Sequence, residues 1–117
     1  MLNKRVHKRV PFEVKVHFDT AVEQIRSHRL LDISMTGCFF ETDTPLPQGT
    51  LGTIKLYLDS GEQHIVISAN GKVIRSLATD IHSKGGLGIE FTEIDTESSI
   101  HLFNVIKYQA DTEHPES

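Results

Sequence analysis

The stretch Leu31-Asp32-Ile33-Ser34-Met35-Thr36-Gly37 lies between two short apolar runs, Leu30-Leu31 and Cys38-Phe39-Phe40. It arranges an acid, a hydroxyl and a glycine as D-x-S-x-x-G. Such residues stabilise a turn between strands, because Asp and Ser bond nearby backbone groups and Gly accepts positive φ. The same groups can also form one wall of a binding site, so the stretch alone leaves both interpretations open.

Alternating apolar residues on both sides of this turn predict a mostly β chain. The first strand is expected from Phe12 to Phe18, whose even-numbered residues are all apolar. Further strands are expected within residues 22–33, 38–41, 54–58, 63–77 and 87–91. Residues 22–33 alternate weakly, which indicates a bulge or an edge strand. Asn70-Gly71 is a hairpin signal, and the competing interpretation is one long strand kinked at Gly71.

The last part of the chain predicts a helix over residues 96–109, with Asp95 as its N-cap and a broad apolar face. Short strands, glycine-rich turns and one terminal helix predict a small antiparallel barrel capped by a helix. The 117 residues fit one domain, and a composition of 38% hydrophobic and 24% charged residues is that of an ordinary soluble protein.

Composition and motifs disfavour several classes of function. No apolar run approaches the ~20 residues of a membrane span, and no secretory signal is evident at the N-terminus. Cys38 is the single cysteine, so we expect a buried apolar role for it and a cytoplasmic location. The seven histidines are not paired at ligand spacing, so no metal site is predicted. No catalytic motif is present, and we expect no enzyme and no cofactor.

The N-terminal arm carries Lys4, Arg5, Lys8 and Arg9 and no acid, although the net charge of the chain is −4. A chain of this charge is poorly suited to general nucleic-acid binding, so the arm fits a small anion better. Arg5 and Arg9 are spaced as R-x-x-x-R, and a guanidinium group can bond phosphate or guanine and stack on a base. On its own this motif is more typical of a solvated basic tail.

Together, R-x-x-x-R and D-x-S-x-x-G in this order resemble the PilZ domain family. The resemblance covers most of the chain. Three later segments also resemble the strands of that family, namely Phe39-Phe40-Glu41, Lys72-Val73-Ile74-Arg75 and Gly86-Leu87-Gly88-Ile89-Glu90-Phe91. The family implies an all-β fold, a six-stranded antiparallel barrel with a C-terminal α-helix, and one long strand through Asn70-Gly71.

The resemblance also implies a ligand, the bacterial second messenger cyclic di-GMP. The residues that match the family's binding motifs are Arg5, Arg9, Asp32, Ser34 and Gly37. Weaker candidates are Lys4, His7, Lys8 and Arg75. In this interpretation residues 1–11 are a flexible arm, residues 12–110 are the barrel with its helix, and residues 111–117 are an acidic tail.

The mechanism expected from this resemblance is ordering of the arm over the barrel when ligand binds. The new surface would act on an unidentified downstream protein or through a homodimer, in motility or biofilm regulation. One alternative is a PilZ-like adaptor that works through protein contacts without ligand. A less favoured alternative is a small barrel that binds single-stranded nucleic acid, which would need exposed aromatic residues on a basic sheet face.

Overall fold

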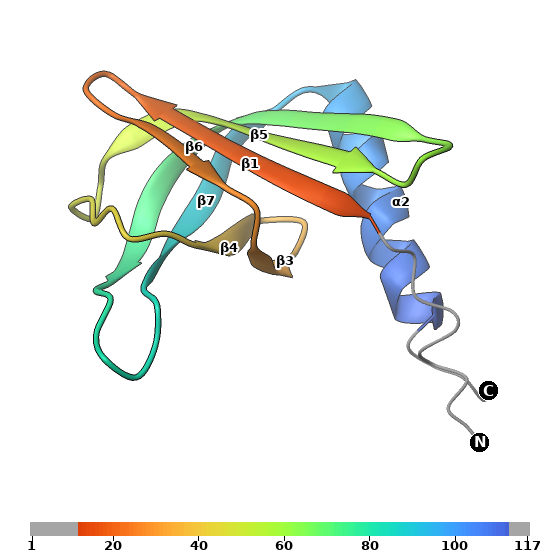
Figure 1. The fold of residues 1–117 in the computed structure, drawn as a ribbon. Helices are drawn as coiled ribbons and strands as arrows, with labels where there is room; N and C mark the ends of the chain where they lie inside the picture. Colours follow the sequence, from red (N-terminus) through yellow and green to blue (C-terminus); the bar gives the residue numbers. More distant parts are fainter. Residues whose placement is uncertain (1–11, 113–117) are drawn as a thin grey trace.

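The computed structural model describes residues 12–112, which form one antiparallel sheet and one helix (Figure 1). The elements are β1 (Glu13–Thr20), β2 (Gln24–Ser27), β3 (Leu30–Ile33), β4 (Gly37–Glu41), β5 (Leu51–Asp59), β6 (His64–Leu77), β7 (Gly86–Ile94) and α2 (Thr96–Thr112). The prediction of an all-β fold with a C-terminal helix is confirmed. The helix was predicted over residues 96–109 and is described to Thr112.

The sheet is strongly curled. Its strand order is β2-β1-β5-β6-β7-β4-β3, so β2 and β3 lie at opposite ends although they follow one another in the chain. The two ends meet through the Ser27 hydroxyl, which donates to the Glu41 carbonyl at 2.6 Å, and the Glu41 amide, which donates to the Arg29 carbonyl at 2.9 Å. Curling therefore brings both ends of the sheet together and encloses the core.

The predicted count of six strands is wrong, since the described residues form seven. The single strand expected over residues 22–33 breaks at His28-Arg29 into β2 and β3. The break is needed because β2 pairs with β1 whereas β3 pairs with β4, at the other end of the sheet. Ser27 stabilises the corner, since its hydroxyl also accepts a hydrogen bond from the Arg29 amide at 3.2 Å.

Strand β6 is one continuous element of 14 residues, which confirms the kinked strand over the hairpin at Asn70-Gly71. The register with β7 shifts between these two residues. A Cβ atom at Gly71 would lie 2.5 Å from Cγ2 of Ile89. The glycine therefore makes room for a core side chain of β7, and it does not form a turn.

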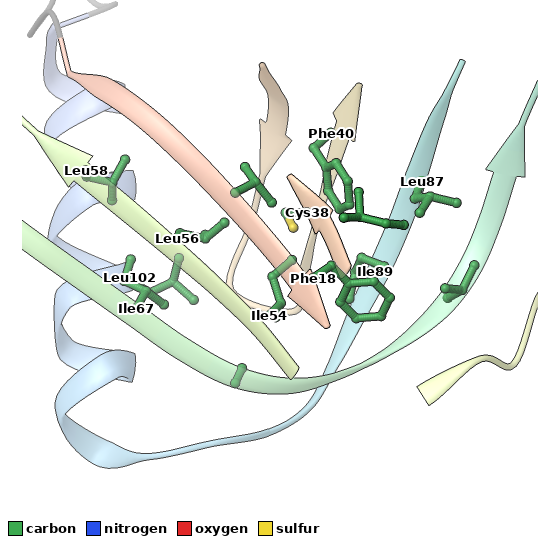
Figure 2. Close-up of a cluster of buried hydrophobic side chains, with 14 of the residues drawn as sticks. Phe18, Cys38, Phe40, Ile54, Leu56, Leu58, Ile67, Leu87, Ile89 and Leu102 are labelled. Carbon is green, nitrogen blue, oxygen red and sulfur yellow. The ribbon is translucent and has the colours of Figure 1, made fainter. Parts of the chain in front are cut away.

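The inward faces of the strands form one apolar core (Figure 2). Its largest fully buried side chains are Phe18, Phe40, Ile54, Leu56, Ile67, Leu87, Ile89 and Leu102. Leu102 and Val105 anchor α2 on this core. Asp95 caps the helix as predicted, because its carboxylate accepts the Ser98 amide at 2.7 Å.

Candidate functional site

The predicted site residues fall into two groups. Arg5, Arg9, Lys4, His7 and Lys8 lie outside the residues that the structure describes. Asp32, Ser34, Gly37 and Arg75 lie within them, on β3, in the turn between β3 and β4, on β4 and on β6.

Ser34 stabilises the turn that joins β3 to β4. Its amide donates to the Gly37 carbonyl at 2.8 Å, and its hydroxyl accepts the Thr36 amide at 3.2 Å. The hydroxyl also lies 3.4 Å from the Gly37 carbonyl oxygen, to which it donates. The local explanation of the motif is therefore correct for Ser34, and its side chain is nevertheless exposed and accessible to a ligand.

Gly37 is required by the pairing of β4 with β7. Its φ angle is not positive, so the positive-φ explanation of this glycine is wrong. A Cβ atom here would collide with the Ile89 carbonyl oxygen of β7. The Phe91 amide donates to the Thr36 carbonyl at 2.8 Å and holds the two strands together at this point. The close approach permitted by Gly37 is thus to the neighbouring strand.

Asp32 presents an exposed carboxylate on the outer face of β3. Within residues 12–112, no hydrogen bond and no ion pair reaches this carboxylate. On the inner side of the sheet, burial raises the pKa of the Cys38 thiol to about 12, and the negative charge of Asp32 makes a smaller contribution in the same direction. Cys38 is 7% exposed and remains a neutral thiol, as its predicted apolar role requires.

Asp32 and Arg75 lie in one cross-strand row on the outer face of the sheet. Asp32 is opposite Phe39, Phe39 is opposite Gly88, and Gly88 is opposite Arg75. Adjacent strands are about 4.8 Å apart, so the two charged residues are separated by roughly 14 Å of sheet. Residues more than forty positions apart in the sequence therefore share one surface.

A β-bulge on β6 places Arg75 on that surface. Val73 pairs with Ile89 and points into the core, and the next pair in the ladder is Arg75 with Gly88. Ile74 is the extra residue between them and is exposed. Without the bulge, strict alternation from Val73 would point Arg75 into the core.

Phe39 forms the floor of the row, and sequence reasoning had not assigned it to the site. The Arg75 guanidinium carbon lies 5.3 Å from the centroid of the Phe39 ring, a cation–π contact. The ring occupies the space beside two glycines of β7, since a Cβ atom at Gly86 would lie 2.7 Å from Phe39 Cζ and one at Gly88 would lie 3.6 Å from Cδ1. The signal in the sequence was the Gly-x-Gly spacing, which leaves two successive outward positions of one strand empty.

A concavity of about 550 Å³ lies beside this row, between the start of β1 and strand β3. It is lined by Phe12, Glu13, Val14, Lys15, His28, Arg29, Leu30 and Leu31. Phe12 is the first described residue after the arm, and Leu31 directly precedes Asp32. The chain therefore enters the barrel next to the strand that carries Asp32.

Residues 12–112 contain no cluster of three or more His, Cys, Asp or Glu side chains that could hold a metal ion. No helix in the same residues is long and apolar enough to cross a membrane.

The sequence matches the PilZ domain over residues 3–108, which is most of its length. The chain belongs to the PilZ domain family. PilZ domains are binding and regulatory domains. The fold is also similar to the structure of the Bacillus subtilis inhibitor of motility (MotI/DgrA), with a TM-score of 0.62 and 20% sequence identity. The similarity covers 88% of this chain and 52% of that protein, so the PilZ chain spans about half the length of its structural relative. No curated protein matches the sequence.

Proposed function

We propose that this PilZ protein is a receptor for cyclic di-GMP. The observation that carries the proposal is the Asp32 carboxylate, which is exposed, has no partner within residues 12–112 and shares a row with Arg75. An unpartnered carboxylate on a rigid strand is preorganised to accept hydrogen bonds from a ligand. Guanine offers two adjacent donors, N1–H and N2–H₂, for such an acceptor.

The two arginines of the arm supply the opposite charge. In this proposal Arg5 and Arg9 bond the phosphates and stack on guanine, while Lys4, His7 and Lys8 add attraction for the anion. Ser34 and Gly37 keep the Asp32 turn in place, and the Ser34 hydroxyl bonds the ligand. Arg75 completes the site from the far end of the row.

The position of Phe12 supports closure of the arm over this surface. Phe12 lines the concavity beside β3 together with Leu31, so a short segment that precedes Phe12 can reach Asp32. Binding would hold the arm against the barrel through contacts made only in the closed state, which is a population shift. The closed arm changes the surface offered to a downstream protein or a second copy of the chain.

We further propose that the protein acts in the cytoplasm, without catalytic activity or cofactor, in the regulation of motility or biofilm formation. The family supports a regulatory role, and the structural relative is named as an inhibitor of motility. That name describes the relative, and the pathway of this chain is part of the proposal.

Calorimetric titration of cyclic di-GMP into the whole chain tests the proposal. Arg9→Ala and Asp32→Ala should each weaken binding by roughly a hundredfold, because each leaves a charged partner uncompensated. Matched controls are Arg26→Ala on β2 and Glu62→Ala in the loop between β5 and β6, which should bind like the wild type. Absence of heat for the wild-type protein at tens of micromolar ligand would refute the receptor.

The same titration separates the second candidate, a PilZ adaptor that works without ligand. Its support is the family itself, which includes protein-contact functions. An adaptor would give no heat with cyclic di-GMP, and Asp32→Ala would leave its complex with a partner intact. The single-stranded nucleic-acid alternative predicts salt-dependent binding of an oligonucleotide instead.

A further inference from the structure

A row of basic side chains crosses the outer face of β2, β1 and β5, in the half of the sheet that does not contain Asp32. Arg26 on β2 is opposite His17 on β1, and His17 is opposite Lys55 on β5. Lys15 lies on the same face of β1 as His17, two residues earlier in the strand. The positive charges of Arg26 and Lys55 lie on either side of His17 and repel one another, so the fold itself gains nothing from this arrangement.

Few acids compensate this row. Asp19 forms an ion pair with Arg26, with 2.7 Å between Arg26 Nη1 and Asp19 Oδ1. Within residues 12–112, neither Lys15 nor Lys55 has an ion pair or a hydrogen bond through its side chain. Partial burial of the imidazole, and then the charges of Arg26 and the two lysines, lower the pKa of His17, so the two lysines are the free cations of the face.

An aromatic pair and a concavity lie next to the lysines, on the part of the face formed by β1, β5 and β6. The rings of His17 and Tyr57 are in contact, with centroids 4.8 Å apart and planes at 59°. Tyr57 is opposite Lys15 on one side and Val66 on the other. These four residues help to line a concavity of about 350 Å³, and Val66 is 45% exposed at its edge.

We propose that this face, defined by Lys15, His17, Lys55, Tyr57 and Val66, binds an acidic, extended segment of a partner protein. Lys15 and Lys55 are diagonal neighbours on adjacent strands, which places them about 7–8 Å apart. Carboxylates at positions i and i+2 of an extended chain are separated by about 6.6–6.8 Å. A segment lying along the strands can therefore meet both lysines and place an apolar residue at i+4 over the concavity.

The surroundings favour this occupant over other anions. Glu13, Asp59 and His64 line the far side of the concavity, and His64 Nδ1 is 3.2 Å from Asp59 Oδ1. Glu13 and Asp59 would repel a phosphate group at that end of the concavity, whereas an uncharged apolar side chain fits there. Nucleic acid needs several phosphate contacts, and two unpaired lysines on a chain of net charge −4 offer too few.

Most of this face lies apart from the row that contains Asp32, although Lys15 also lines the concavity next to β3. The face belongs to β1, β5 and β6, whereas Asp32 and Phe39 belong to β3 and β4 at the end of the sheet order (Figure 1). An acidic segment that lies along β1 and β5 would therefore leave Asp32 and Phe39 uncovered.

The test uses the whole chain, labelled with nitrogen-15, and a synthetic peptide of sequence Ala-Glu-Ala-Glu-Ala-Leu-Ala with blocked ends. We expect saturable shifts of the backbone amides of β1 and β5 at millimolar peptide or below. The double variant Lys15→Gln/Lys55→Gln should bind about tenfold more weakly, since it removes two exposed ion pairs. The matched double variant Lys84→Gln/Lys107→Gln loses the same charge elsewhere and should bind like the wild type, as should Asp32→Asn.

Several results would overturn the proposal. These are the absence of saturable shifts, equal binding of a peptide with Gln in place of Glu, or tighter binding of a thymidine oligonucleotide to the same amides. A concentration-dependent dimer that Lys15→Gln/Lys55→Gln abolishes would assign the face to a second copy of the chain. Thermal unfolding of the double variant provides the remaining check. A fall in melting temperature of more than about 4 °C would show that the lysines serve the fold.

Discussion

Arg75 lies over the ring of Phe39, with 5.3 Å between its guanidinium carbon and the ring centroid. The contact crosses β7 at Gly88, where a side chain is absent. A double-mutant cycle with Phe39→Leu and Arg75→Gln should give a coupling energy of about 0.5–1 kcal/mol, the usual range for an exposed cation–π pair. Urea unfolding measures each free energy. Arg75→Gln combined with the distant Tyr57→Leu should be additive, and a zero coupling with Phe39 would contradict the contact.

Gly37→Ala should destabilise the protein by about 2 kcal/mol or more. The new Cβ atom meets the Ile89 carbonyl, which belongs to the backbone of the neighbouring strand and cannot turn away. Chemical denaturation measures the change. Thr36→Ala in the same turn removes only an exposed hydroxyl and should change stability by less than about 1 kcal/mol. If both variants were equally stable, the pairing of β4 with β7 would not depend on the glycine.

Deletion of Ile74 should be tolerated, whereas deletion of Ile67 should abolish folding. Ile74 is the unpaired residue of the bulge and is exposed, so its removal leaves Val73 opposite Ile89 and Arg75 opposite Gly88. Ile67 is buried in the part of β6 that pairs with β5 without a register shift, so its deletion removes a core side chain and turns the residues on one side of the deletion to the other face. Circular dichroism and urea unfolding of the two deletion variants compare them directly. Equal loss of structure in both would show that the bulge is essential for the fold.

Ser98→Ala should destabilise the protein by about 1–3 kcal/mol. Ser98 is 5% exposed, and its hydroxyl accepts the Ser68 amide of β6 at 3.0 Å, beyond the part of that strand that pairs with β7. Its removal leaves a partly buried N–H group without a partner. Ser99→Ala in the same helical turn serves as the control in thermal unfolding. A loss of stability in Ser99→Ala as large as in Ser98→Ala would contradict the role assigned to Ser98.

Cys38 should make stability fall at alkaline pH. Its pKa is raised from 9.0 to about 12 in the folded state, so the thiol contributes stability that is fully present below pH 9. Above pH 9 the unfolded chain loses the proton first, and stability declines up to about pH 12. Between pH 8 and about pH 11, the free energy of unfolding should fall less steeply with pH in Cys38→Ala than in the wild type. The difference in slope should correspond to the release of up to one proton. Equal slopes in the two proteins would show that the folded thiol ionises normally.

Sequence patterns predicted the fold where each local preference agreed with the final packing. Alternation over residues 12–18 and 87–91 produced the buried faces of β1 and β7, and Asp95 caps the helix as expected. The long strand through Asn70-Gly71 was predicted only because the family resemblance outweighed a hairpin signal, and the structure confirms it. The local preference of these two residues is overruled by the space that Ile89 needs.

The site was only partly predictable. The D-x-S-x-x-G motif predicted Asp32 and Ser34 as site residues from residue type and spacing, and their role in binding stays a prediction. Phe39 was missed because an aromatic residue in a strand is usually assigned to the core. Its outward position depends on pairing with Gly88, which is far away in the sequence.

The sequence by itself determined the mostly β class, the terminal helix and the residue types of the R-x-x-x-R and D-x-S-x-x-G motifs. These depend on near neighbours, because alternation and capping act within a few residues of the chain. Only the tertiary structure decided that residues 22–33 split into two strands, that the bulge at Ile74 turns Arg75 outward, and that Arg75 shares a row with Asp32. The physical reason is register. Which residues face one another across a curled sheet is set by the pairing of distant strands, and a shift of one residue moves every later side chain to the other face.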